Sequence, residues 1–272
     1  MKILLVNNLY KNNTKLMAEK IAVELQKLNI SVVIDGGNEE PSLKDVDKII
    51  VLGGDGTILR AARQYARWQL PVLGVNMGTV GFLTNIEINE LPEYMQRFIA
   101  GDYKIDERLM LEVNIYQHDI LQKTIYCLNE VAVRSETTRM VGLNVQIDEQ
   151  VAGYYRGDGT IIATPTGSTA YSLACGGPVA DPDLEIFILT PIATNLVCKK
   201  PMIIAADRTL YLHNFECYRA IICMDGQEQV ELQPDHIIQI KKAPFKFQRV
   251  DLKGTPFFTI VEDRLRRNEG IF

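Results

Sequence analysis

A short run of glycines around one aspartate is the first place in this chain where chemistry is expected. Gly53-Gly54-Asp55-Gly56-Thr57 follows an apolar stretch and precedes a segment with helical spacing. Glycines let main-chain N–H groups approach phosphate oxygens closely, and the start of a helix adds partial positive charge. A carboxylate among such donors would repel a phosphate by itself. Asp55 therefore makes chemical sense if it holds Mg²⁺ or accepts a proton from an attacking hydroxyl.

This glycine-rich run matches neither of the two common phosphate-binding motifs. It lacks the lysine of GxxxxGK[ST], and its glycines do not follow the GxGxxG spacing. A structural alternative stays open, in which the segment is a tight strand-to-helix turn and Asp55 caps the helix. The run alone thus predicts phosphate binding without excluding a purely structural role.

A second cluster of small and hydroxyl residues occupies positions 163–178, with the sequence ATPTGSTAYSLACGGP. It lies where a strand passes into a helix that we expect to begin near Ser168. Small residues let a ligand lie against the main chain, hydroxyls can donate to ribose or phosphate, and Tyr171 could stack on a ring. The alternative is a Ser/Thr-rich loop with ordinary capping, which two such loops in one chain make less attractive.

Two further polar sites interrupt apolar sequence. Asn129-Glu130 lies inside an expected strand, 124–134, where a polar pair is costly to bury unless it bonds something. A carboxylate suits a sugar diol, although strand alternation could instead point Glu130 at solvent. Arg156-Gly157-Asp158-Gly159-Thr160 is either a simple turn or a means of bringing a carboxylate to the same site.

The elements that must position these residues change character along the chain. The first hundred residues alternate strands and helices, which predicts a parallel sheet with helices on both faces. Asn13 is the expected N-cap of the first helix. The helix after the glycines carries Arg60, Arg63 and Arg67 on one face, as either a phosphate patch or a solvated surface. Strands are expected at 3–6, 32–34, 49–52 and 72–75, and the first helix at about 13–28.

Beyond about residue 101 the pattern becomes that of short strands and polar turns. Asp225-Gly226 is a hairpin signal between two of them. We expect an N-terminal Rossmann-like α/β domain, residues 1–100, and a mainly antiparallel β domain, residues 101–251, with the active site in a cleft between them. The other expected strands of the second domain are 109–117, 143–148, 151–155, 186–190, 208–213, 219–224, 229–232 and 236–241.

Composition narrows the class of protein. The chain has 272 residues, 47% hydrophobic and 23% charged, as in an ordinary soluble protein of about two domains. Its net charge of −5 gives no general attraction to nucleic acid or anionic lipid. We expect no membrane segment and a cytoplasmic protein, because no apolar stretch approaches the ~20 residues of a membrane span. Five cysteines without a CxxC pair, and three histidines, predict free thiols and no zinc cluster.

Taken together, these motifs resemble those of the NAD kinase family. They occur in the family's order from about residue 47 to residue 226, and the block 164–171 is the most specific. The matching segments are 53–57, Gly74-Val75-Asn76 with Gly78 and Gly81-Phe82-Leu83, Asn129-Glu130, 157–159, 164–171, 176–178 and Asp225-Gly226.

The resemblance implies a phosphotransferase with an alcohol acceptor. It would transfer the terminal phosphoryl group of ATP to the 2′-hydroxyl of the adenosine ribose of NAD, giving NADP, with Mg²⁺ or another divalent cation. Residues at about 252–272 would complete the first domain, and a homodimer or homotetramer would be usual. Asp55 would be the catalytic carboxylate, and no residue is assigned as a metal ligand. The residues implied to bind the substrates are Gly53, Gly54, Gly56, Thr57, Asn76, Phe82, Asn129, Glu130, Arg156, Asp158, Thr169, Ala170, Tyr171, Ser172, Asp225 and Gly226.

The implied roles divide along the chain. The glycines of the first run would cradle phosphate, and Asn129 and Glu130 would hold the ribose and nicotinamide side of NAD. Residues 169–171 would line the adenine and ribose pocket, and Asp158 would approach the nicotinamide end from its own or a neighbouring subunit. The family usually has a Pro-His pair followed by Leu and Ser after Thr190-Pro191-Ile192-Ala193, where this chain has residues 194–198, TNLVC. The contacts of that histidine are therefore not expected here.

Three other functions stay open. A lipid kinase can share the glycine-rich turn, but the block 164–171 and the absence of a basic surface disfavour it. A non-catalytic NAD or NADP sensor on the same fold would keep the pocket, yet it would not need Asp55. A sugar kinase of the phosphofructokinase type is disfavoured by the β-rich second half. The phosphoryl donor, whether ATP, another nucleotide or polyphosphate, also stays open, as does the choice between NAD and NADH.

Overall fold

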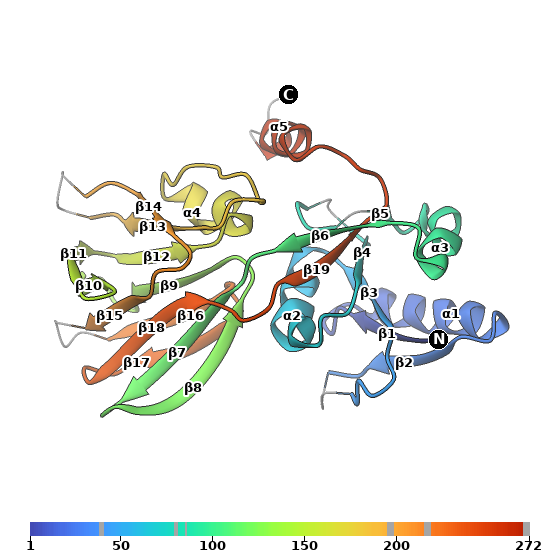
Figure 1. The fold of residues 1–272 in the computed structure, drawn as a ribbon, viewed down its shortest axis with the longest axis horizontal. Helices are drawn as coiled ribbons and strands as arrows, with labels where there is room; N and C mark the ends of the chain where they lie inside the picture. Colours follow the sequence, from blue (N-terminus) through green and yellow to red (C-terminus); the bar gives the residue numbers. More distant parts are fainter. Residues whose placement is uncertain (38–40, 79–80, 85, 195–198, 215–218, 269–272) are drawn as a thin grey trace. The chain divides into compact units, whose positions relative to one another are not determined.

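The computed structural model describes residues 1–37, 41–78, 81–84, 86–194, 199–214 and 219–268. The chain divides into two compact units (Figure 1). The first comprises residues 1–107 together with 247–272, and the second comprises residues 108–246. The chain therefore leaves the first unit once and returns to it near its end.

The first unit is built on one sheet with the strand order β2-β1-β3-β4-β19-β6, in which β5 also pairs with β4. Strands β1, β2, β3 and β4 run parallel, and so do the pairs of β4 with β5 and β19. The expected parallel sheet is confirmed. Its strands are β1 (Lys2–Asn7), β2 (Ser31–Asp35), β3 (Lys48–Gly53), β4 (Val72–Asn76), β5 (Ile86–Glu87), β6 (Lys104–Arg108) and β19 (Phe247–Asp251).

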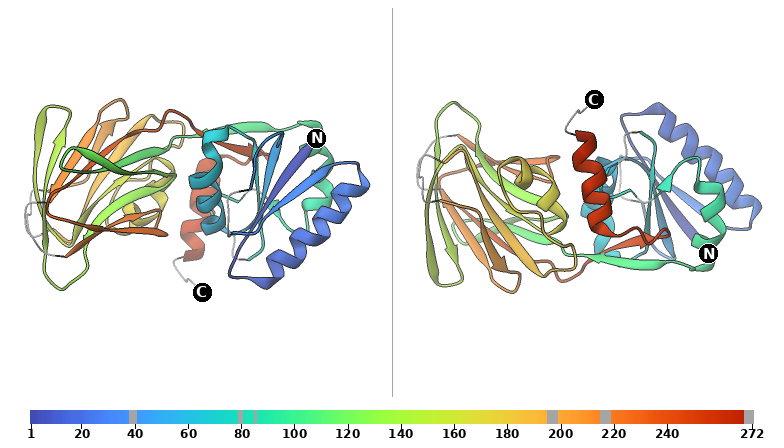
Figure 2. Two further views of the ribbon diagram at one scale, coloured as in Figure 1. Left: turned by 90° about the horizontal axis from the view of Figure 1, so that it is seen from below. Right: turned by 90° about the horizontal axis from the view of Figure 1, so that it is seen from above.

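Helices cover both faces of this sheet (Figure 2). Helices α1 (Asn12–Lys27) and α3 (Leu91–Ala100) share one apolar cluster with Leu73 and Val75 of β4. Helix α2 (Asp55–Tyr65) lies on the other face, where Ile58 packs against Gly74. The unit also contains η1 (Ala66–Trp68) and α5 (Phe257–Asn268). The N-cap of α1 is Lys11, without a side-chain cap bond, so the expectation for Asn13 is wrong by two residues.

The second unit consists of two six-stranded antiparallel sheets with the orders β11-β10-β15-β18-β7-β8 and β14-β13-β12-β9-β16-β17. One apolar cluster joins them, with members such as Val113 and Leu143 from the first and Val133 and Leu189 from the second. The α/β plus β-rich fold class is thus confirmed. The strands are β7 (Leu111–Gln117), β8 (Ile120–Cys127), β9 (Glu130–Ser135), β10 (Val141–Ile147), β11 (Gln150–Gly157), β12 (Gly159–Ala163), β13 (Ile186–Ile192), β14 (Met202–Ala205), β15 (Leu210–Asn214), β16 (Ala220–Met224), β17 (Glu228–Leu232) and β18 (His236–Lys242).

A loop with two short helical turns covers the outer face of the second sheet. It contains η2 (Thr166–Thr169) and α4 (Tyr171–Ala174), where one helix near Ser168 was expected. Beneath the loop, Ala132, Ile161 and Ile188 form an outer apolar cluster together with Ala180. The part of the outer face beneath the loop is therefore buried as well.

The single strand expected over residues 124–134 is wrong in one informative respect. Strand β8 ends at Cys127 in one sheet and β9 begins at Glu130 in the other, so Leu128 and Asn129 carry the chain between the sheets. Cys127 and Val131 both contribute to the core between the sheets. The polar pair Asn129-Glu130 therefore marks a sheet change and does not interrupt a strand.

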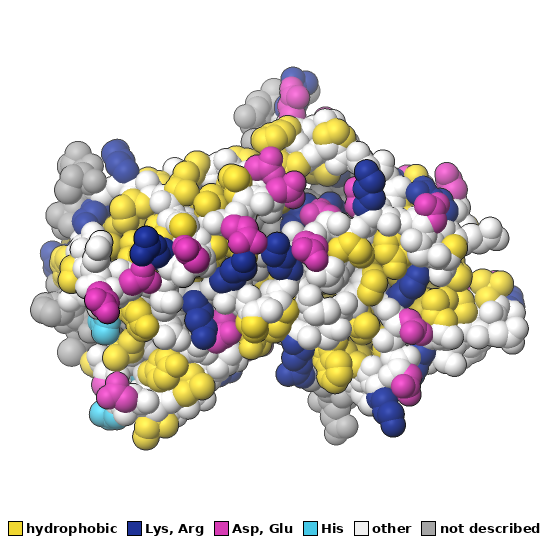
Figure 3. All heavy atoms as spheres, viewed as in Figure 1, with side chains coloured by type: hydrophobic (Ala, Val, Ile, Leu, Met, Phe, Trp, Pro, Cys, Tyr) yellow, Lys and Arg dark blue, Asp and Glu magenta, His cyan; other side chains and the backbone are white. Residues whose placement is uncertain are grey.

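The surface mixes charges of both signs. Lys and Arg side chains lie among Asp and Glu side chains on the face that Figure 3 shows. Ion pairs such as that of Lys242 with Glu185, at 2.6 Å, join charges of opposite sign. Among the described residues, no helix is long and apolar enough to cross a membrane.

Candidate functional site

Asp55 lies where β3 passes into α2, and its side chain is held by a different loop. The N-cap of α2 is Gly54, and Asp55 is the first helical residue. Its Oδ2 accepts a hydrogen bond from the main-chain N–H of Phe82 (2.7 Å), and Oδ1 accepts one from Leu83 (3.0 Å). The N-cap position is taken by Gly54, and the Asp55 carboxylate bonds the 82–83 main chain, so the alternative in which Asp55 caps the helix is wrong.

The glycines around Asp55 have different reasons to be glycine. A Cβ atom at position 53 would lie 2.2 Å from Thr57 Oγ1, and one at position 81 would lie 2.1 Å from Asp55 Oδ1. These two are required by the protein's own packing. At Gly54 nothing lies within 4 Å of the Cβ position, and its φ of −110° is open to any residue. Space beside the main chain at a helix start is what a phosphate needs.

Asn76, at the end of β4, completes this part of the first unit. It pairs in register with Gly53, so the carboxyl ends of the two strands are neighbours. Its amide nitrogen donates to Gly78 O (2.8 Å), and its amide oxygen accepts from Gly78 N–H (3.2 Å). The structure thus brings Gly53, Asp55 and Phe82 together with Asn76, and the Asn76 amide fixes the turn at residues 76–78.

Arg60, one of the three arginines expected on one face of the helix after the glycines, is neither part of a phosphate patch nor a solvated surface residue. Its guanidinium forms an ion pair with Asp35 at 2.5 Å and donates to Asn7 O at 2.9 Å. The Asp35 side chain is only 2% exposed. Arg60 therefore ties α2 to the sheet. Arg67 lies beyond α2, in η1, and is exposed beside Trp68.

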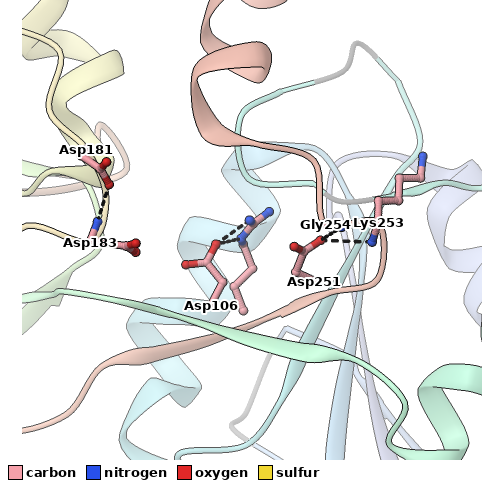
Figure 4. Close-up of polar contacts among 7 residues, drawn as sticks. Asp106, Asp181, Asp183, Asp251, Lys253 and Gly254 are labelled. Carbon is pink, nitrogen blue, oxygen red and sulfur yellow. Dashed lines mark hydrogen bonds and ion pairs between the residues drawn. The ribbon is translucent and has the colours of Figure 1, made fainter.

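Other carboxylates of the first unit bond groups on or near β19 (Figure 4). Asp251 accepts the main-chain N–H groups of Lys253 (3.1 Å) and Gly254 (3.0 Å). Asp106 accepts two hydrogen bonds from Arg249, of 2.8 and 2.5 Å. These contacts were not anticipated from the sequence, and none of them involves an expected site residue.

In the second unit the expected hairpin at Asp225-Gly226 is confirmed, and it carries a further contact. Both residues have positive φ, +49° and +65°, between β16 and β17. The Asp225 carboxylate accepts three main-chain N–H groups, from Leu128 (3.0 Å), Asn129 (2.8 Å) and Glu130 (3.2 Å). It therefore holds the segment where the chain changes sheets.

Glu130 is buried, with 6% of its surface exposed, so the alternative that it points at solvent is wrong. One carboxylate oxygen accepts the main-chain N–H of Tyr171. The other, Oε2, has no hydrogen-bond partner in the part of the chain that the structure describes. Burial, and then the charge of Asp225, raise the pKa of Glu130 to about 8. The side chain is mainly protonated at neutral pH and can donate as well as accept.

The block 164–172 wraps around this segment. Thr164 Oγ1 donates to Leu128 O (2.6 Å) and accepts from Gly167 N–H (3.0 Å). A Cβ atom at Gly167 would lie 2.1 Å from Asn129 O. Ser168 Oγ accepts from Ala180 N–H, and the Ser172 hydroxyl bonds that of Thr190 at 2.8 Å. Most hydroxyls of the block thus stabilise the loop itself. Thr169 and Ala170 are half-buried, and Tyr171 is 36% exposed.

Arg134 lies beside Tyr171, and the sequence motifs did not identify it as a site residue. It donates a hydrogen bond to the Tyr171 hydroxyl, and burial raises the pKa of that hydroxyl. Residues 130, 132 and 134 share one face of β9 because side chains alternate along a strand. That alternation, counted from Glu130, would have found Arg134.

Arg156 and Asp158 lie elsewhere on the second unit. Asp158 is exposed between β11 and β12. In the register of β9 and β12, Gly159 pairs with Arg134 and Ala163 with Glu130. Asp158 is therefore about 16 Å along the strand from Glu130, since it lies five residues from Ala163 at about 3.3 Å per residue. The structure does not bring Asp158 and Glu130 together within one chain.

The stretch expected to differ from the family pattern is mostly outside the described residues. Asn195, Leu196, Val197 and Cys198 belong to that part. Thr194 is described, and its hydroxyl donates to Arg156 O at 3.1 Å. The end of β13 is thereby connected to β11.

The fold and these two groups of residues define a kinase-type phosphotransferase. An α/β unit carries a glycine-rich turn and a fixed carboxylate at the carboxyl ends of parallel strands, which is where such sheets bind ligands. A β-rich unit carries a buried carboxyl group, one oxygen of which has no partner within the described part of the chain. Sequence profiles then identify the family: residues 41–103 match the ATP-NAD kinase N-terminal domain, and residues 128–252 match the C-terminal domain. The chain belongs to the ATP-NAD kinase family.

Individual relatives agree with this assignment. The chain is 36% identical over 227 residues to the NAD kinase of Heliobacterium modesticaldum, covering 83% of this chain and 80% of that protein. It is 38% identical over 221 residues to the NAD kinase of a Thermoanaerobacter species, covering 80% and 78%. The crystal structure of an NAD kinase from Archaeoglobus fulgidus in complex with ATP is 30% identical, with a TM-score of 0.78 over 98% of this chain and 99% of that one. Yeast NADH kinase shares the fold at 21% identity, with a TM-score of 0.88 over 100% of this chain and 89% of that one.

Proposed function

We propose that this protein transfers the terminal phosphoryl group of ATP to the 2′-hydroxyl of the adenosine ribose of NAD, giving NADP, with Mg²⁺ as the divalent cation and Asp55 as the proton acceptor. Membership of the ATP-NAD kinase family supports the substrates. The observation that carries the residue assignment is the Asp55 carboxylate, fixed by the N–H groups of Phe82 and Leu83 beside an open helix start.

The held carboxylate suits proton transfer. Phosphoryl transfer is helped mainly by alignment and by charge neutralisation, and a ribose hydroxyl is a weak nucleophile. Each carboxylate oxygen has about two acceptor directions, and each Asp55 oxygen uses one for a main-chain N–H. The remaining directions can accept the proton of the 2′-hydroxyl as the bond to phosphorus forms.

The glycine-rich turn would bind the phosphates. Gly53, Gly54 and Gly56 present main chain at the start of α2, and Thr57, Asn76 and Phe82 line the same turn or the adjacent loop. Mg²⁺ commonly binds through one or two carboxylates together with phosphate oxygens and water, and it neutralises phosphate charge. Asp55 has free acceptor directions for that purpose, so the residues present fit such an ion.

The second unit would bind NAD. The unpartnered Glu130 Oε2 and the buried Thr166 Oγ1, which also has no partner among the described residues, mark where a polar ligand would bond. Residues 101–251 would form the NAD-binding domain, and residues 1–100 with 252–272 the phosphate-binding domain. A cytoplasmic homodimer or homotetramer is part of this proposal. The NAD-binding residues proposed are Asn129, Glu130, Arg156, Asp158, Thr169, Ala170, Tyr171, Ser172, Asp225 and Gly226.

The test is to incubate the purified protein with NAD and Mg-ATP and to measure NADP, with polyphosphate and NADH as alternative donor and acceptor. Asp55→Asn should bind NAD and form almost no NADP. Asp251→Asn is the matched control, because Asp251 also accepts two main-chain N–H groups in the first unit. A wild-type protein that binds NAD but makes no NADP with either donor would favour the sensor alternative. Full activity in Asp55→Asn would show that Asp55 is not the proton acceptor.

A further inference from the structure

Asp225 is a buried carboxylate that bonds three main-chain groups of one segment. It is 5% exposed, and its three acceptor bonds go to the consecutive N–H groups of residues 128–130. Its own N–H donates to Glu130 O at 2.9 Å. Four hydrogen bonds therefore join the hairpin turn to the three residues that carry the chain from one sheet to the other.

The segment that Asp225 holds is also confined from the opposite side. Thr164 bonds Leu128 O, and Thr164 N–H donates to Asn129 O at 2.8 Å. The close approach of Gly167 to Asn129 allows no side chain there. Glu130 thus projects from a segment fixed on two sides, and its Oε2 has no partner among the residues that the structure describes.

We propose that Asp225 is a positioning residue, which acts on NAD binding by fixing the Asn129-Glu130 segment through its three main-chain hydrogen bonds. This rests on the proposed function, in which Glu130 contacts NAD. It also refines the expectation that Asp225 itself binds the ligand, because Asp225 acts through the segment it holds. The hairpin that the sequence predicts as a simple turn thereby becomes part of the binding machinery.

Besides fixing the position of the Asn129-Glu130 segment, the negative charge of Asp225 affects the ionisation of Glu130. A second carboxylate near Glu130 disfavours ionisation of Glu130. Asp225 therefore helps to keep Glu130 as a hydrogen-bond donor, suited to an acceptor such as a carbonyl oxygen or a ring nitrogen. Several other groups face Glu130 or its immediate neighbours, and all of them are present in both the wild type and a variant altered only at position 225: Tyr171 and Cys175 from the covering loop, Cys223 of β16 and Arg134 of β9.

The test compares Asp225→Asn with Asp148→Asn in the full-length protein. Asn keeps the size of the side chain and tolerates positive φ, but it has a single oxygen acceptor and no charge. Asp148 is a matched control, because it lies in the β10–β11 turn with φ +51° and accepts Thr209 N–H at 2.9 Å. Steady-state kinetics with NAD and with ATP, and thermal unfolding, are measured for both variants.

We expect Asp225→Asn to raise the KM for NAD roughly tenfold or more while the KM for ATP stays unchanged, since charge-assisted hydrogen bonds are lost. The KM for NAD should rise with pH in the wild type as Glu130 ionises near its pKa of about 8, and this rise should begin at lower pH in the variant. Asp148→Asn should alter neither property. A purely structural Asp225 would lower the melting temperature and leave both KM values and the pH profile unchanged, and that result would overturn the inference. A wild-type protein without NAD phosphorylation would instead contradict the proposed function.

Discussion

The carboxylate of Asp55 occupies the space that a side chain at position 81 would need. A Cβ atom on Gly81 would lie 2.1 Å from Asp55 Oδ1 and 2.2 Å from its Cγ. Both residues after Gly81 donate their N–H groups to the same carboxylate. Gly81 is therefore the residue whose lack of a side chain allows the loop to hold Asp55.

Replacement of Gly81 by alanine should consequently displace the Asp55 carboxylate. We expect kcat to fall by about 100-fold, as for misplacement of a catalytic group by about 1 Å, while NAD still binds. Gly36→Ala is the matched control, because nothing lies within 4 Å of its Cβ position, and it should keep wild-type kinetics. Steady-state kinetics and NAD binding of the two variants check this, and an unchanged kcat in folded Gly81→Ala would contradict it.

Two buried threonines of the second unit should respond oppositely to replacement by valine. Thr164 makes two side-chain hydrogen bonds, to Leu128 O and from Gly167 N–H, whereas the buried Thr160 Oγ1 has no partner among the described residues. Thr164→Val should lower the free energy of unfolding by about 1–3 kcal/mol, because it leaves buried groups unpaired. Thr160→Val should be neutral or stabilising. Denaturant unfolding of both variants tests the pair, and equal effects would show that the Thr164 bonds contribute nothing.

Much of the first unit was predictable because its signals are local. Buried parallel strands read as short apolar runs, and the glycine-rich turn sits directly between β3 and α2. The strands β6 and β19 were not expected, since they come from distant parts of the chain and complete the sheet only through pairing. Arg60 shows the same limit, because its partner Asp35 is 25 residues away.

In the second unit, the residue types of the site were predictable and their roles were not. The hairpin signal of Asp225-Gly226 is local, and the turn is present as expected. The bonds from Asp225 to residues 128–130 cross almost a hundred residues of sequence, so no spacing rule reveals them. The sequence singled out the hydroxyls of residues 164–172 as candidates for ligand binding. Most of them instead bond other groups of the protein, because a buried loop must satisfy its own polar groups.

Substitutions of Arg60 in α2 and Arg67 in η1 distinguish a structural role of these arginines from a ligand-binding one. Arg60→Ala should lower the free energy of unfolding by about 3–5 kcal/mol, because it leaves the buried Asp35 carboxylate unpaired. Exposed Arg67→Ala should change it by no more than about 0.5 kcal/mol. Neither change should alter the KM for ATP in the folded protein. Urea unfolding and ATP kinetics check this, and a raised KM for ATP with unaltered stability in Arg60→Ala would restore the phosphate-patch alternative.

Glu130 makes the stability of the unliganded protein depend on pH in a definite direction. Its pKa is raised from an ordinary 4.5 to about 8, chiefly by burial. Between these values the folded protein holds a proton that the unfolded chain has lost, so the free energy of unfolding falls as pH rises, by up to about 1.4 kcal/mol per unit. Glu130→Gln has no such proton to lose. Its stability relative to wild type should therefore increase from pH 5 to pH 8 and then level off.

Denaturant unfolding at pH 5, 6.5 and 8 without substrates measures this difference. Glu149→Gln, at an exposed position in the β10–β11 turn, corrects for the loss of one surface carboxylate. Parallel pH dependences for wild type and Glu130→Gln would mean that Glu130 is ionised in the folded protein. In that case it could not donate a hydrogen bond to NAD, and the KM for NAD would be independent of pH near 8. A stability difference that widens up to about pH 8, together with weaker NAD binding above it, would show that one protonated carboxyl group governs both properties.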